Sequence, residues 1–181
     1  GGHTLGHYMS AAAQGIVNPG VTAEQKEKLT ERLNYIIDSL ADCQKKTEGV
    51  KGLEGYIFGA TLPNSSFEDN VALQFDNVES GRANIATEAW VPWYTMHKIL
   101  AGLVDSYQIA GNKTALEVAN KLGTWIANRA NGWSSSTQST VLGIEYGGMN
   151  DALYQLYKVT DASNKEDFYK AAHQFDETAL F

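Results

Sequence analysis

The sequence predicts an all-α fold built from three antiparallel α-hairpins. Three observations carry this prediction. Apolar residues recur at spacings of three and four in every long segment, Gly, Asn or Asp interrupts the pattern at short turns, and the segment 103–109 matches 153–159 at a shift of fifty residues. Because short connections join antiparallel neighbours, successive helices are expected to pair into hairpins.

The first hairpin is predicted from about Leu5 to Val17 and from Ala23 to Leu40, with a break at 18–20 that reads Asn-Pro-Gly. Thr22 is a good N-cap for the second helix. The buried face of that helix is predicted to carry Leu29, Leu33, Ile36, Ile37 and Leu40. Cys43 follows this stripe and is expected to be a small buried side chain.

The same periodicity predicts two further hairpins. The third and fourth helices are expected over 96–107 and 114–126, joined at Ala110-Gly111-Asn112. The fifth and sixth are expected over 149–157 and 168–175, joined at 161–163. All six principal helices are therefore predicted without any β-sheet.

A long insertion, from about Gly49 to Ala89, separates the first two hairpins. It is rich in Gly, Asn and Ser but also contains aromatic residues, so an ordered loop that covers something is expected. Helical repeat arrays have nearly uniform units, whereas these hairpins are unequal. The pattern therefore favours part of an (α/α)₆ toroid, with residues 1–181 forming part of one domain.

Composition excludes several classes of partner. A net charge of −7 and an aromatic content of 10% argue against nucleic acid and are compatible with a cleft that stacks on sugars. No apolar run of about 18 residues is present, so no membrane span is predicted. Cys43 is the only cysteine, which excludes an internal disulfide or a cysteine-based zinc site. The chain opens without an initiator Met, and its compartment stays open.

Two histidines occupy matching positions near the starts of alternate predicted helices. His7 and His97 share this phase, and in a ring of hairpins these helices would line the same cleft. Each could equally be an ordinary core or surface histidine. His3 and His7 lie four residues apart, as two metal ligands on one helix face would, but the motif is weak without a third donor.

Two further stretches contain candidate ligand-binding residues. Trp93 lies in a Trp-Val-Pro-Trp-Tyr run at the start of the third helix, where an aromatic face suits a sugar; a buried structural role is the alternative. Glu145 and Asn150 flank two glycines before the fifth helix and offer a carboxylate and an amide. Glu145 could be an acid, a base or a hydroxyl-binding group, or it could complement the N-terminus of this fifth helix.

Three motifs in register, at 2–11, 90–98 and 145–150, resemble the β-L-arabinofuranosidases of glycoside hydrolase families 127 and 146. The resemblance extends over essentially the whole chain. It implies an (α/α)₆ catalytic barrel followed by β-sandwich domains, and retaining enzymes that release terminal L-arabinofuranose from glycans. It also implies a zinc-bound cysteine thiolate as nucleophile and a glutamate as acid/base.

The sequence departs from this family pattern at the catalytic residues and the zinc ligands. Cys43 matches none of the family's zinc ligands, so no catalytic residue and no metal site is carried over to this chain. We expect the chain to contribute part of a sugar-binding cleft and to be inactive alone. The residues carried over as substrate-binding candidates are His97, Glu145 and Asn150, followed by Trp93, His3 and His7.

A partial toroid is also expected to have an open edge, which would bind the remainder of the toroid or a second copy. The predicted exposed residues there are Tyr8, Phe168, Phe175, Leu180 and Phe181. Two alternatives stay open: a complete helical carbohydrate-binding or scaffold protein that uses Trp90, Trp93 and Trp133, and a different (α/α)₆ sugar-active enzyme.

Overall fold

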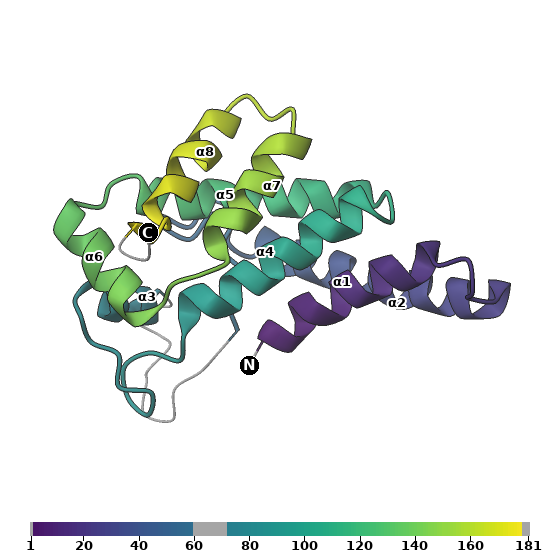
Figure 1. The fold of residues 1–181 in the computed structure, drawn as a ribbon, viewed down its shortest axis with the longest axis horizontal. Coiled ribbons are helices and arrows are strands. Elements are labelled where there is room, and N and C mark those ends of the chain that lie inside the picture. Colours follow the sequence, from purple (N-terminus) through teal and green to yellow (C-terminus); the bar gives the residue numbers. More distant parts are fainter. Residues whose placement is uncertain (1, 60–71, 179–181) are drawn as a thin grey trace.

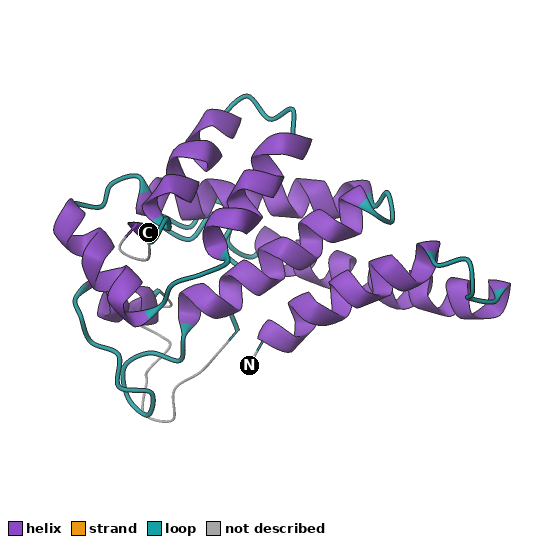
Figure 2. Cartoon of the chain, viewed as in Figure 1, coloured by secondary structure: helices purple, strands orange, loops and turns teal. Residues whose placement is uncertain are grey.

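The chain is entirely helical wherever its structure is described. The computed structural model describes residues 2–59 and 72–178, and within them it has eight α-helices and no strand (Figure 2). The all-α prediction is confirmed. None of these helices is both long and apolar enough to cross a bilayer, among the residues described.

Six of the helices form the three predicted hairpins, which lie side by side in Figure 1. Each hairpin pairs a first helix with an antiparallel second helix across a short turn. The hairpins are α1 (His3–Val17) with α2 (Ala23–Lys45), α4 (Pro92–Gln108) with α5 (Lys113–Ala130), and α7 (Met149–Val159) with α8 (Lys165–Gln174).

The hairpins stack so that two layers form. The first helices pack in sequence, α1 against α4 and α4 against α7, and the second helices do the same, α2 against α5 and α5 against α8. This is the packing of an (α/α)₆ toroid, in which one layer faces the centre. Three hairpins are half of the six that such a ring contains.

Glycines permit the close crossing of α1 and α4. A Cβ atom placed on Gly6 would lie 1.9 Å from the carbonyl oxygen of Lys98, and one on Gly102 would lie 2.6 Å from the carbonyl oxygen of Gly6. The two helix backbones therefore touch where neither has a side chain. This contact fixes the position of the middle of α4 against α1.

The centre of the molecule is an aromatic cluster rather than an aliphatic one. Trp93 lies at its middle, with ring centroids 4.7 Å from Phe75, 5.2 Å from Phe175 and 5.3 Å from Trp133, each in an edge-to-face arrangement. Such pairs add about 0.5–1.5 kcal/mol each beyond the burial of their area. The cluster joins α4 to α8 and to the insertion.

Two short helices were not predicted. The first, α3 (Leu73–Glu79), lies in the insertion and packs against α6 (Ser135–Ile144). The sequence of α6 is rich in Ser and Thr and buries only Val141 and Leu142, so it lacks the periodic apolar face that identifies a helix. Phe75 of α3 is fully buried, and it anchors the insertion in the aromatic core.

The predicted burial was wrong at three positions. Cys43 is exposed, because Gln44 takes the position four residues after Leu40 and so occupies the buried face of α2. Phe168 and Phe175 were expected at an open edge, but they are 0% and 3% exposed because they pack inward against the core. Tyr8 is 37% exposed, as expected, and Leu180 and Phe181 lie outside the described residues.

Candidate functional site

The candidate residues gather where the first helices of the hairpins begin. His3 starts α1, and its ring centroid lies 6.0 Å from that of Tyr94 in the first turn of α4. Tyr94 in turn packs against His97, one turn further along α4, at 5.2 Å. The segment that precedes α7 contacts the same turn of α4. The N-terminal ends of α1, α4 and α7 are therefore assembled into one surface.

The N-terminus of α4 has no local cap. Val91 occupies the N-cap position with a left-handed backbone (φ 35°), which a β-branched residue rarely adopts, and its side chain offers no oxygen. Pro92 follows and has no N–H to be satisfied. The first free backbone donors of the helix are consequently those of Trp93 and Tyr94.

Glu145 supplies the missing cap from a distant part of the chain. It follows α6, and its own N–H donates to the carbonyl of Val141 at 2.8 Å. Its Oε2 accepts the backbone N–H of Tyr94 at 2.8 Å, and the backbone N–H of Trp93 also donates to this carboxyl group. No acidic residue lies in the first turn of α4, so Glu145 is also the charge that complements the helix dipole.

The Glu145 carboxyl group is 7% exposed, and burial raises its pKa to about 7, against the lowering effect of the two backbone donors. Its second oxygen, Oε1, has no hydrogen-bond partner in the described structure, and neither has the nearby indole Nε1 of Trp93. Only one of the two carboxyl oxygens is therefore hydrogen-bonded, and with a pKa of about 7 the group is close to half protonated near neutral pH.

His97 is also buried, at 4% exposed. Burial lowers its pKa to about 4, with smaller contributions from the positive charge of Lys98 and from His7. Gly148 makes room for the ring: a Cβ atom there would lie 2.4 Å from Nε2 of His97. His97 is therefore a neutral imidazole held against the backbone of the segment that enters α7.

Both residues lie at the N-terminal end of α4: His97 is part of that helix, and Glu145 hydrogen-bonds to its first turn. The hollow lined by Trp93, Tyr94, Glu145 and Tyr146 has a volume of about 10 Å³. That is room for about one water molecule and not for a sugar ring. His97 does not line this hollow, and the expectation that His97 and Glu145 face a common concavity stays a prediction.

Trp93 and Asn150 serve the fold in this structure. Trp93 is 2% exposed, which favours the buried structural role that the sequence left open. Asn150 uses both ends of its amide: Nδ2 donates to Asp176 Oδ1 at 3.0 Å, and Oδ1 accepts the N–H of Asp151 at 2.9 Å. Asp176 also binds Tyr154, so this group ties the end of α8 to the start of α7.

Some of the exposed residues of this surface were not predicted from the sequence. His3 is half-buried and His7 is exposed, whereas Tyr94 and Tyr146 are 39% and 60% exposed. Tyr94 belongs to the Trp-Val-Pro-Trp-Tyr run but was not selected as a site residue. The sequence contains a signal for this exposure: successive residues of a helix point about 100° apart, so burial of Trp93 directs Tyr94 toward a different face of α4.

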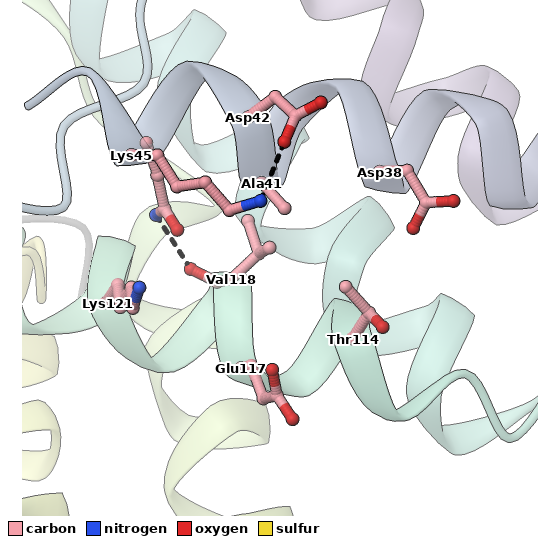
Figure 3. Close-up of a pocket in the computed structure, with 9 residues that line it drawn as sticks. Asp38, Ala41, Asp42, Lys45, Thr114, Glu117, Val118 and Lys121 are labelled. Atoms are coloured by element: carbon pink, nitrogen blue, oxygen red, sulfur yellow. Dashed lines mark hydrogen bonds and ion pairs between the residues drawn. The ribbon is translucent and has the colours of Figure 1, made fainter.

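A larger hollow lies elsewhere, between α2 and α5 (Figure 3). It has a volume of about 350 Å³ and is lined by charged residues of both signs. Lys45 in its wall pairs with Asp42 at 2.8 Å, but both side chains are well exposed, so the pair contributes little stability. None of the candidate residues lines this hollow.

The donor set for the zinc site that the resemblance implies does not fit this chain. Such a site needs several cysteine thiolates, and the exposed Cys43 on α2 is the only cysteine in the sequence. Residues 2–59 and 72–178 contain no group of three His, Cys, Asp or Glu side chains placed to hold a metal ion. No step of the chemistry is therefore assigned to a metal held by these residues.

The stacked hairpins define an all-α domain with the packing of an (α/α)₆ toroid, and His, Tyr and Glu side chains gather where its first helices begin. Residues 1–181 match the family model described as "Beta-L-arabinofuranosidase, GH127 catalytic domain". The chain belongs to this family. A search of curated proteins finds no match.

Proposed function

We propose that this chain forms part of the sugar-binding cleft of a glycoside hydrolase that acts on L-arabinofuranose-containing glycans. The carrying observation is the assembly of His3 and Tyr94 at the N-terminal ends of α1 and α4, in a chain that belongs to the GH127 family. His7 and the exposed Tyr146 extend this surface, and His97, Glu145, Asn150 and Trp93 lie behind it.

The proposed chemistry of the surface is recognition of a neutral sugar. An exposed Tyr face packs on the C–H-rich side of a sugar ring, and imidazole nitrogens form hydrogen bonds with its hydroxyl groups. Trp93 is buried and Trp133 packs against it, which disfavours stacking of sugars on these two rings, whereas Trp90, the third ring of the alternative binding module, is 39% exposed.

We further propose that the chain alone does not hydrolyse the glycosidic bond. Retaining hydrolysis needs a nucleophile and an acid/base group on opposite sides of the bond. Glu145 has a raised pKa that would suit an acid, but its Oε2 is committed to backbone donors. The lone cysteine is remote from this surface in sequence and lies exposed on α2.

Calorimetric titration with methyl β-L-arabinofuranoside tests the binding proposal. Tyr94→Ala should weaken binding at least about fivefold, the effect of losing about 1 kcal/mol of ring contact. Tyr35→Ala is the matched control, because Tyr35 is 75% exposed on α2. Equal affinities for both variants and the wild type would refute the cleft assignment, and release of L-arabinose by the purified chain would refute inactivity.

A further inference from the structure

The cap on α4 links three pieces of the candidate surface through a single side chain. Glu145 is anchored at the end of α6, hydrogen-bonds to the first turn of α4, and begins the segment that leads to α7. Three residues later, Gly148 lies against the His97 ring. The segment 145–148 therefore touches α4 at two places one turn apart.

One contact acts on Tyr94 of the proposed sugar surface, and the other acts on His97, which lies behind it. The carboxylate holds the backbone of Tyr94, whose ring packs against His3 on one side and His97 on the other. Lys98 also lies over the Tyr94 ring, with Nζ 5.3 Å from the centroid. Movement of the first turn of α4 would displace the Tyr94 ring from all three neighbours.

No local group can replace Glu145 in this role. Val91 offers no side-chain oxygen, Pro92 has no N–H, and the backbone at Val91 is in a conformation that costs on the order of 1–3 kcal/mol. An uncapped helix end would let this turn relax toward an ordinary conformation. The strained entry to α4 is thus maintained by a side chain that lies 51 residues further along the chain.

We propose that Glu145 is a positioning residue: by capping α4 from the α6–α7 segment it fixes Tyr94 and His97 for sugar recognition, without contacting the sugar itself. The part of this inference that concerns sugar recognition rests on the proposed function. The cap itself and its effect on His97 can be measured without sugar. For this role the Glu145 side chain must be long enough to reach α4 and must offer a hydrogen-bond acceptor. Its negative charge matters less than these two properties.

Two conservative variants separate reach from charge. Glu145→Gln keeps the length and one carbonyl acceptor, whereas Glu145→Asp keeps the charge but is one methylene too short to reach the Tyr94 N–H. Amide hydrogen exchange and the ring proton resonances of His97 would be recorded by NMR for both variants of the chain. Asp151→Asn is the control, since Asp151 is an exposed acidic residue in the first turn of α7 that also acts electrostatically on His97.

The expected result is that Glu145→Asp speeds exchange of the Trp93 and Tyr94 amides at least about tenfold, as for loss of a hydrogen bond to a charged group. It should also shift the His97 ring resonances. Glu145→Gln should retain the protection and the wild-type resonances, and Asp151→Asn should leave both amides protected. If the Asp variant unfolds while the Gln and Asp151→Asn variants stay folded with both amides protected, that contrast supports the cap, and lost protection in the Gln variant overturns it.

Wild-type protection in Glu145→Asp would also overturn the proposal, as would identical behaviour of the Asp and Gln variants. A parallel titration with methyl β-L-arabinofuranoside separates the two claims. Absence of sugar binding in the wild type would remove the proposed function, while the exchange data would still report whether Glu145 holds α4.

Discussion

At the scale of single residues, the molecule buries two ionisable groups whose pKa values move in opposite directions. The pKa of Glu145 is raised from 4.5 to about 7 and that of His97 is lowered from 6.5 to about 4, in each case chiefly by burial. Both groups are consequently neutral over part of the acid range, and each makes folding depend on pH.

The two dependences have opposite signs. Folding raises the affinity of Glu145 for a proton, so its contribution to stability is full below pH 4.5 and is lost as pH rises to about 7. Folding lowers the affinity of His97, so its contribution is full above pH 6.5 and is lost as pH falls to about 4. Between pH 4.5 and 6.5 the two slopes oppose each other.

We therefore predict that substituting either group reveals the pH dependence of stability that the other group causes. In Glu145→Gln the stability should rise with pH between 4 and 6.5, and in His97→Gln it should fall between pH 4.5 and 7, relative to the wild type. Each change is on the order of 3 kcal/mol, since one pKa unit is worth about 1.4 kcal/mol. Urea unfolding at a series of pH values measures it, and profiles parallel to the wild type would contradict both assignments.

A pair of neighbouring glycines gives a second test at this scale. Gly147 and Gly148 both have positive φ, 87° and 91°, but a Cβ on Gly147 would meet nothing within 4 Å, whereas one on Gly148 would strike His97. Gly147→Ala should cost about 1–2 kcal/mol of stability from backbone strain alone. Gly148→Ala should cost about 1–3 kcal/mol more, from overpacking. Equal melting temperatures for the two variants would show that the His97 contact is absent.

At the scale of elements, the contact of α1 with α4 sets the site, because it brings His3 to Tyr94. Gly6→Ala should be strongly destabilising, by about 2–4 kcal/mol, since its Cβ would lie 1.9 Å from the Lys98 carbonyl oxygen of an immobile helix. Gly143→Ala in α6 is the matched control: it has open space and should stabilise its helix by up to about 1 kcal/mol. Thermal unfolding of the two variants measures the contrast, and a Gly6→Ala protein as stable as the wild type would exclude the close crossing.

The sequence predicted six of the eight helices because their apolar spacing is regular, and it missed the two whose residues do not show that pattern. Ser and Thr fill α6, and α3 has only seven residues, so tertiary contacts rather than periodicity define both. The candidate site was predicted in outline only. Glu145 was recognised, but the helix end that it caps lies 51 residues earlier, and no local pattern reports such a partner.

At the scale of the whole molecule, three hairpins stack as half of a six-hairpin ring. The prediction that the chain has an open edge stays a prediction, although Phe168 and Phe175 do not contribute to it because they are buried. Exposed aromatic residues do occur on the last hairpin: Tyr169 is 40% exposed and its ring packs against Tyr154 and Tyr157. These rings lie on the hairpin whose far side would meet a fourth.

Self-association is the expected consequence of such an edge. Light scattering of the isolated chain should give a mass above that of one copy, and Tyr169→Lys should shift the distribution toward the monomer, because a charged side chain opposes burial of the surface. Tyr35→Lys, on α2 of the first hairpin, is the control. A monodisperse monomer at all accessible concentrations would contradict the prediction.

We propose that the N-terminal ends of α1, α4 and α7 form a sugar-facing surface of this GH127 family member. Backbone chemical-shift mapping with methyl β-L-arabinofuranoside tests it most directly, because the competing hollow between α2 and α5 reports through different residues. We expect perturbations centred on His3, Tyr94 and His97. Perturbations centred on the α2–α5 hollow, or none at saturating sugar, would contradict it.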